Sequence, residues 1–229
     1  IGYWVDLDNP YITYEPKYME TVWWLLKQLY NKDLLYKGYT IQPYSPKAGT
    51  GLSSHELNQP GTYRDVSDTT VVAQFSVKNL SEKASEKISN LKSQISNLSI
   101  LAWTTTPWTL PSNTALAVGR DIEYVLVKTF NQYTFEPINI ILARPLLEKQ
   151  FGKKFVEGTD EDFANYTAES KTIPYQVLAE FTGEDLAGTT YEQLIPWFLP
   201  AENPDQAFRV IIGDFVTTED GTGIVHIAP

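Results

Sequence analysis

The residues best suited to chemistry in this 229-residue chain lie in one short stretch. Leu101 to Asn113 has the sequence LAWTTTPWTLPSN, in which Thr104 to Thr106 place three hydroxyls in a row. An apolar run precedes them, and Pro107 cannot continue a helix or a central strand, so we expect the threonines where a strand opens into a loop. Hydroxyl and backbone N–H groups placed there can hold a ligand, and Trp103 and Trp108 can supply apolar walls.

An alternative interpretation is that these threonines simply end a strand. Threonine is a good strand former, and a threonine run before proline is common at strand ends. A single histidine at a strand end, such as His226, is likewise more often structural than catalytic. The residue types alone favour the structural interpretation in both places.

The reactive groups limit the chemistry that the chain can perform. There is no cysteine, and the only histidines are His55 and His226, so a Ser-His-Asp mechanism has little support. An activated ester needs only a positioned water, a fixed carbonyl and stabilisation of the oxyanion. Thr105, Thr106 and Asn113 carry hydroxyl and amide groups suited to those tasks without ionising. His55 lies in the exposed-looking SSHE segment and is interpreted as a surface residue.

Short β-like runs dominate the chain after Gly38 and must position these groups. Nine runs are rich in β-branched and aromatic residues, and most are bounded by Pro, Gly or Asn: 39–44, 70–77, 100–104, 114–118, 122–129, 138–143, 175–181, 208–216 and 223–227. Only two or three helices accompany them. We therefore predict an α+β fold with a mixed, β-barrel-like core and peripheral helices.

Two segments have helical periodicity. Residues 15–30 are predicted to form an amphipathic helix that packs through the stripe of Met19, Val22, Trp23, Leu26 and Leu29. Residues 80–99 are rich in Ser, Lys and Glu and have apolar residues at helical spacing, which predicts a helical insertion between two strands. Its lysines Lys83, Lys87 and Lys92 do not share one face, so a solvated surface helix is favoured over an RNA-binding stripe.

Composition indicates a folded chain without membrane spans. A hydrophobic content of 42% over 229 residues suffices for a large core, and no stretch approaches the length of a membrane span. The absence of cysteine fits the cytoplasm. The net charge of −10 has the wrong sign for unaided phosphate binding. Because the chain begins at Ile1 and Met19 is the only methionine, we expect that the natural reading frame starts upstream.

Three motifs resemble segments of one protein family and occur in the same order as they do in that family. WTTTPWTLPSN is similar to the threonine-rich signature of the editing (connective polypeptide) insertion of isoleucyl-tRNA synthetases of the eukaryotic cytoplasmic type, whose leucyl and valyl relatives carry arginine in place of Thr106. GEDLAGTTY followed by Leu194 resembles the family's GxxLxGxxYxPL stretch, with Gln193 in place of proline. EDGTGIVHIAP at 219–229 resembles GTGxVHxAP, and the opening YWVDLD resembles the segment that leads into the insertion.

The resemblance implies a proofreading domain of the class I isoleucyl, valyl and leucyl type. It would hydrolyse the ester of tRNA(Ile) carrying valine at its 3′ end, with a positioned water, and would exclude isoleucine by size. A module that only positions the tRNA acceptor end is the alternative from another class. Editing of threonine by a valyl-type domain would require the absent arginine. The implied partners are tRNA(Ile) and the rest of the synthetase chain, with no membrane.

The resemblance also implies roles for individual residues. Residues 1–45 would form a largely helical connective segment that packs on an editing domain at 46–229. The implied catalytic residues are Thr105, Thr106, Asn113 and His226, and the implied substrate-binding residues are Thr104, Trp108 and Gly223. No cofactor is expected in this domain, since ATP and magnesium belong to the parent ligase.

Two departures from the family bear on these expectations. Ser45 and Ala48 replace a cysteine pair that can hold zinc in relatives, so no metal is expected there. The chain ends at Pro229, before an aspartate expected to bind the substrate's α-ammonium group. We therefore expect the fragment to hydrolyse valyl-tRNA only weakly.

Overall fold

The chain forms two separate units in a computed structural model that describes residues 2–91 and 95–228. Ile1, residues 92–94 and Pro229 lie outside the described residues, and with them Lys92 of the predicted insertion. Contacts divide the chain into unit 1, Ile1–Val66, and unit 2, Ser67–Pro229. This division lies further along the chain than the sequence-based one between residues 45 and 46. The reason is local pairing, since residues 44–51 form a hairpin within unit 1.

Unit 1 consists of the predicted helix and a small hairpin. Helix α1 spans Pro16–Tyr30 with proline in its first turn, as expected. Strands β1 (Tyr44–Ser45) and β2 (Thr50–Gly51) pair antiparallel, and the single-turn helix α2 covers Ser54–Leu57. The strand predicted at 39–44 is wrong, because only its last residue pairs and Pro43 has no N–H to donate to a neighbour.

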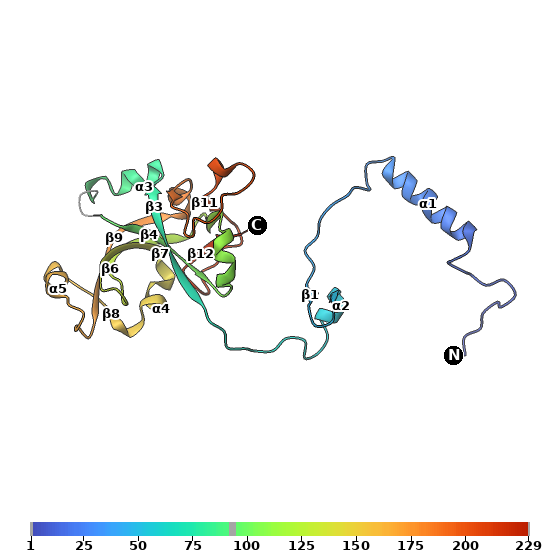
Figure 1. The fold of residues 1–229 in the computed structure, drawn as a ribbon, viewed down its shortest axis with the longest axis horizontal. Coiled ribbons are helices and arrows are strands. Elements are labelled where there is room, and N and C mark those ends of the chain that lie inside the picture. The colour runs from blue at the N-terminus through green and yellow to red at the C-terminus, as the bar shows by residue number, and fades with distance from the viewer. Residues whose placement is uncertain (1, 92–94, 229) are drawn as a thin grey trace. The chain divides into compact units, whose positions relative to one another are not determined.

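Unit 2 is built on one mixed sheet of ten strands in the order β12-β5-β11-β10-β3-β4-β7-β6-β9-β8 (Figure 1). Three neighbouring pairs are parallel, namely β4 with β7, β5 with β11 and β8 with β9, and the other pairs are antiparallel. The strands are β3 (Val71–Asn79), β4 (Leu98–Thr104), β5 (Ala115–Val118), β6 (Glu123–Phe130), β7 (Pro137–Ala143), β8 (Phe155–Glu157), β9 (Ile173–Thr182), β10 (Thr190–Tyr191), β11 (Arg209–Ile212) and β12 (Ile224–Ile227). The helices are α3 (Glu82–Lys87), α4 (Leu147–Phe151), α5 (Asp160–Asn165) and α6 (Gly183–Leu186).

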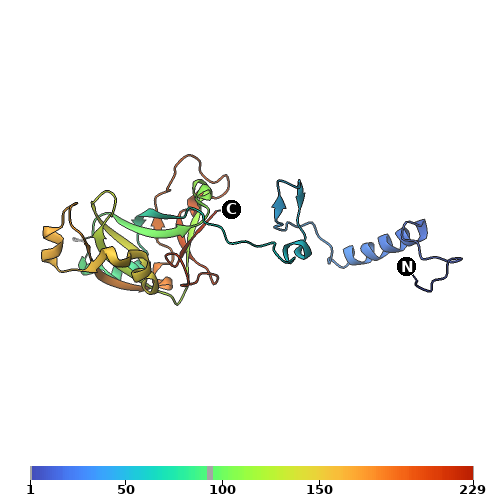
Figure 2. The same ribbon diagram turned by 90° about the horizontal axis from the view of Figure 1, so that it is seen from below.

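The sheet curls strongly, so that unit 2 has a barrel-like form (Figure 2). Strand β12, at one edge of the hydrogen-bonded order, also lies against β4. The backbone N–H of Ala143, at the end of β7, donates to the carbonyl of Thr222 at 2.9 Å, just before β12. This closure gives the α+β, β-barrel-like architecture that the sequence predicts.

The core lies on the inner face of the curled sheet. Alternate residues of β4, such as Ile100 and Ala102, are buried in the larger apolar cluster together with Leu116 of β5 and Ile224 of β12. Residues of the opposite parity, such as Leu101, belong to a second, smaller cluster. Because side chains alternate along a strand, each strand's inward set continues to the end of the barrel.

The segment 80–99 is helical over a shorter range than the sequence predicts. Ser81 caps α3 by accepting a hydrogen bond from the backbone N–H of Ala84 at 3.1 Å, and the helix ends at Lys87. Ile88 is buried at 3% exposure, and a short 3-10 turn, Ser89–Leu91, follows it. Lys83 and Lys87 form ion pairs with the carboxylates of α6, Glu184 and Asp185, at 2.9 and 2.6 Å.

Other differences concern short elements. The run at 208–216 is a strand only over β11, because the chain turns at Gly213, whose N–H donates to the carbonyl of Val118 at 2.9 Å. Strands β8 and β10 were not predicted, since three or two residues give too short a pattern to recognise. In the described part of the chain, every helix is too short or too polar to cross a membrane.

Candidate functional site

The inner face of the barrel ends in two polar residues, Thr104 and His226. Thr104 follows Ile100 and Ala102 on the inward side of β4 and is 7% exposed. His226 pairs with Leu116 of β5, so its side chain lies on the same face as that buried leucine. The alternation that fills the core with aliphatic side chains therefore brings a hydroxyl and an imidazole to one end of it.

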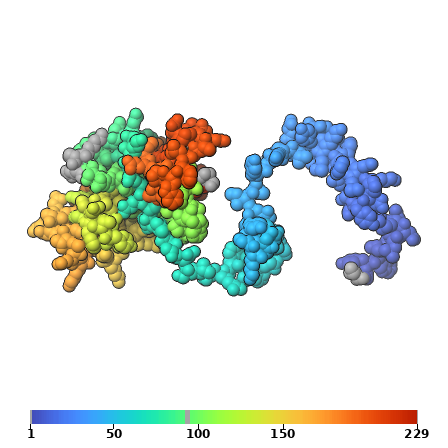
Figure 3. Space-filling view, in the orientation of Figure 1, coloured from blue at the N-terminus to red at the C-terminus, as the bar shows by residue number. Residues whose placement is uncertain are grey.

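A 3-10 helix, η2 (Pro107–Ser112), lies across this end and carries the rest of the threonine-rich motif. Leu110 of η2 is buried in the larger apolar cluster, which anchors the turn to the barrel. The backbone N–H of Thr106 donates to Thr104 Oγ1 at 3.0 Å, so the chain reverses directly at the end of β4. In Figures 1 and 3, this segment, in green, lies beside the red C-terminal segment that contains β12.

A hydrogen-bonded chain joins the motif to His226. Thr109 Oγ1 donates to the carbonyl of Thr106 at 2.8 Å and lies 2.9 Å from His226 Nε2. The hydroxyls of Thr104 and Thr106 are 3.3 Å apart. Three hydroxyls and one imidazole, from segments 117 residues apart, thus form a single polar cluster.

The surroundings of His226 favour its neutral form. The ring is half-buried, and the loss of water around it lowers the pKa of the imidazole below its usual range. Within residues 2–91 and 95–228, its Nδ1 atom is buried and has no hydrogen-bond partner. A ring protonated on both nitrogens would therefore carry a half-buried charge and a buried N–H on Nδ1 without a partner, which burial disfavours.

This burial predicts a fall in stability at acidic pH. A histidine whose pKa is lower in the folded chain than in the unfolded chain stabilises the fold above the unfolded pKa, and that contribution is lost as pH falls through the folded pKa. We expect the urea midpoint of the wild type to fall between pH 7.5 and 5.5 by more than that of His226→Gln. His55→Gln, which removes the chain's other imidazole from an exposed helix, should keep the full fall. Equal falls for His226→Gln and the wild type would contradict the assignment.

Asn113 is buried, and its side-chain amide already makes hydrogen bonds within the fold. Its side chain is 3% exposed, and Nδ2 donates to the carbonyls of Ala115 at 2.9 Å and Ile227 at 3.4 Å. The hydroxyl of Tyr191 donates to Asn113 Oδ1 at 2.7 Å, and burial raises the pKa of this tyrosine. Asn113 therefore links β5, β10 and the end of β12, one residue from His226.

The remaining predicted site residues lie in different settings. Thr105 is exposed, and so is Trp108, with 68% of its surface accessible. Gly223 is buried at the start of β12, about 10 Å along the strand from His226. Its φ is +70°, and a Cβ placed there would lie 2.3 Å from that of Ala143, so glycine is required for packing at this position. Gly223 thus lies apart from the threonine–histidine cluster.

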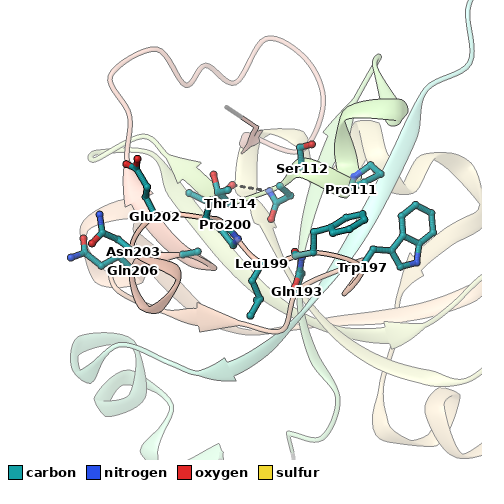
Figure 4. A pocket seen from close by; sticks show the side chains of 15 residues that line it. Pro111, Ser112, Thr114, Gln193, Trp197, Leu199, Pro200, Glu202, Asn203 and Gln206 are labelled. Carbon is teal, nitrogen blue, oxygen red and sulfur yellow. Dashed lines mark hydrogen bonds between the residues drawn. The ribbon is translucent and has the colours of Figure 1, made fainter.

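A cleft of about 770 Å³ opens beside Asn113, which is one of the residues that line it (Figure 4). Trp197, Phe198, Leu199 and Pro200 give it apolar walls, and Gln193, Asn203 and Gln206 contribute carboxamides. Neither lysine nor arginine is among the residues that line it. The cleft therefore suits an uncharged, flat group with polar edges better than a phosphate.

Sequence reasoning missed Thr109, which makes the direct contact with His226. The signal was present, because residues three apart in a 3-10 helix lie one above the other. Thr106 and Thr109 have this spacing on either side of Pro107 and Trp108. The sequence alone does not show that the Thr109 hydroxyl contacts His226, because His226 lies 117 residues further along the chain.

Comparison with known proteins identifies the protein family to which the chain belongs. Residues 1–198 match the family model described as tRNA synthetases class I (I, L, M and V), and the chain belongs to that family. Among curated proteins, it is 62% identical to the isoleucine–tRNA ligase of Bacteroides fragilis (strain YCH46) and 60% identical to that of Cytophaga hutchinsonii. Each alignment covers 100% of this chain and 19% of the relative.

The resemblance to isoleucyl-tRNA synthetases is thereby confirmed, and the chain spans about a fifth of the length of these relatives. Both relatives are bacterial, whereas the sequence motifs were compared with the eukaryotic cytoplasmic type. Among solved structures, the editing domain of the P. falciparum cytosolic leucyl-tRNA synthetase, with deletions of two insertions, is similar at a TM-score of 0.46 and 12% identity. That similarity covers 69% of this chain and 62% of the other.

Proposed function

We propose that unit 2 is a proofreading domain that hydrolyses the ester of valyl-tRNA(Ile). The observation that carries this proposal is the hydrogen-bonded cluster of Thr104, Thr106, Thr109 and His226 at the end of the barrel, in a chain of the isoleucyl-tRNA synthetase type. The cluster supplies hydroxyl and backbone groups that bind an ester without ionising. It contains neither a cysteine nor a serine that an imidazole activates.

The reaction requires little from the protein. A water oxygen forms a bond to the ester carbonyl, the bond between that carbon and the ribose oxygen breaks, and the ribose oxygen receives a proton. Valine and uncharged tRNA(Ile) are released. Thr105 and Thr106, at the mouth of the turn, would hold the carbonyl and the water, since positioning and oxyanion stabilisation are the largest contributions to such a step.

Size exclusion explains why a second site is needed. One methylene is worth only about 1–3 kcal/mol in an apolar pocket, and isoleucyl-tRNA synthetases are themselves the standard illustration of this limit. A synthetic site chosen for isoleucine must accept some valine. His226 would limit the editing pocket to the shorter side chain, so that only the mistaken product is hydrolysed.

The cleft beside Asn113 is the proposed place for part of the terminal nucleoside. Its aromatic and amide lining suits a base, and it lies directly beyond the turn that would hold the ester. The chain carries a net charge of −10, so the phosphates of tRNA must be held by the rest of the synthetase. A cytoplasmic location remains a prediction.

A deacylation assay tests the proposal. We expect this chain, extended through the downstream aspartate, to hydrolyse valyl-tRNA(Ile) at least about tenfold faster than isoleucyl-tRNA(Ile), and the 229-residue chain to retain the preference at a lower rate. Replacing Thr105 and Thr106 together with valine keeps the side-chain volume, removes both hydroxyls and should abolish the hydrolysis of valyl-tRNA(Ile). Equal and slow loss of both esters would support the alternative of a positioning module without hydrolytic activity.

A further inference from the structure

Arg209 is the arginine of unit 2 that has no carboxylate partner among the described residues. Unit 2 contains three arginines, Arg120, Arg144 and Arg209. Arg120 lies 3.6 Å from a carboxylate oxygen of Glu184, and Arg144 forms an ion pair with Glu180. Because a guanidinium is always charged near neutral pH, the charge of Arg209 is left without a negative partner.

The hydrogen-bond donors of Arg209 are also mostly unused. Nη2 donates to the backbone carbonyl of Asp205 at 2.9 Å, whereas Nε is buried and has no acceptor within residues 2–91 and 95–228. A guanidinium has five N–H donors, and a buried donor without an acceptor costs free energy. A half-buried cation that is short of acceptors is what an anion-binding site requires.

This side chain lies beside the cleft that Asn113 helps to line. Arg209 and its register partner on β5, Ala115, project from the same face of the sheet, and Ala115 lines the cleft. The carbonyl that Arg209 bonds belongs to the 3-10 helix η5 (Pro204–Gln206), whose last residue also lines the cleft. The guanidinium therefore lies at the edge of the cleft that η5 forms.

The two ends of the cleft differ in chemistry. Trp197 lies at one end, and Asn203 and Gln206 lie at the other, on the side of η5 (Figure 4). Glu202 also lines the cleft but is exposed, so water and salt screen its carboxylate. A base against the tryptophan and an anion at Arg209 is the arrangement that one nucleotide with its phosphate would fill.

We propose that Arg209 binds the phosphate on the 5′ side of the nucleoside that occupies the cleft. The identity of that nucleoside as the terminal adenosine of valyl-tRNA(Ile) rests on the proposed function, whereas the anion site does not. A phosphate supplies the acceptors that the guanidinium lacks, and arginine binds phosphate through two parallel hydrogen bonds. The contact is local, so the rest of the synthetase still holds the other phosphates of the tRNA.

Adenosine and adenosine 5′-monophosphate differ only by the phosphate and test this site without any hydrolysis. The readout is NMR titration of the Trp197 indole N–H in the 229-residue chain, with Trp197→Phe to assign the signal. We expect the wild type to bind the monophosphate about tenfold more tightly than adenosine, the equivalent of one hydrogen bond to a charged group. Arg209→Gln should bind both ligands equally. Arg209→Lys should keep a preference of about threefold, because it retains the charge without the planar fork.

Arg120→Gln is the matched control, because it removes the same charge from an exposed ion pair of unit 2 and should keep the tenfold preference. If Arg209 only holds η5 in place, Arg209→Gln will weaken both ligands alike and leave their ratio unchanged, which would overturn the proposal. Equal binding of the two ligands by the wild type, or no shift with either, would overturn it as well.

The extended chain separates this inference from the proposed function. Selective hydrolysis of the valyl ester without a phosphate preference that depends on Arg209 would contradict the phosphate site and leave the proposed function standing. A phosphate preference that Arg209→Gln removes, in a chain that hydrolyses neither ester, would support the phosphate site and contradict the proposed function.

Discussion

His226→Ala is expected to raise the hydrolysis of isoleucyl-tRNA(Ile) by about ten- to hundredfold and to leave valyl-tRNA(Ile) a substrate. The imidazole lies on the inward face of β12, level with Leu116 and at the end of the apolar core. Alanine frees the volume of the ring, which exceeds the one methylene that separates the two substrates. Because one methylene is worth about 1–3 kcal/mol, removing the barrier against it should have an effect of the same size.

The measurement is the deacylation rate of each ester by the extended chain under single-turnover conditions. His55→Ala is the matched control, since it removes the only other imidazole from an exposed helix in unit 1. Loss of valyl-ester hydrolysis by a hundredfold or more in a folded His226→Ala chain, with no gain for isoleucine, would mean that the ring takes part in the chemistry.

The sequence predicts the strands and turns that carry the site better than it predicts the hydrogen bonds between the site's side chains. Thr104 was expected where β4 ends, because an apolar strand followed by threonines and Pro107 admits few other conformations. The barrel-like fold followed from short runs that are rich in β-branched and aromatic residues and are mostly bounded by Pro, Gly or Asn. These are local properties, and local patterns are what a sequence displays directly.

The contacts that give the residues their roles are not local. The bond between Thr109 and His226 depends on which strand pairs with β5, and no spacing in the sequence encodes that register. Asn113 was expected to face the ester, but its donors are taken by backbone carbonyls and its acceptor receives the hydroxyl of Tyr191, 78 residues away. Gly223 belongs to a family motif, but its close packing against Ala143 by itself explains why this position needs glycine.

Asn113→Ala is expected to destabilise unit 2 by about 3 kcal/mol. The substitution leaves the Tyr191 hydroxyl buried without its acceptor, and it removes the side-chain hydrogen bonds to the carbonyls of Ala115 and Ile227, of which the second still accepts from the backbone N–H of Thr114. Each buried polar group that loses its partner costs about 1–3 kcal/mol. Tyr191→Phe removes only the hydroxyl and should cost about 1 kcal/mol, because the amide of Asn113 keeps its two donor bonds.

Urea unfolding of the two single variants and the double variant measures this network. We expect the double variant to be less destabilised than the sum of the single variants by about 1 kcal/mol, since the two side chains share one hydrogen bond. Asn79→Ala is the control, because this exposed amide bonds Thr190 at 3.3 Å and should cost little. The hydrogen bonds of Asn113 should also affect activity, because Asn113 bonds the carbonyl of Ile227, the residue that follows His226. If Asn113→Ala abolishes hydrolysis without changing the urea midpoint, then the amide contacts the ester directly and does not merely hold β12 in register.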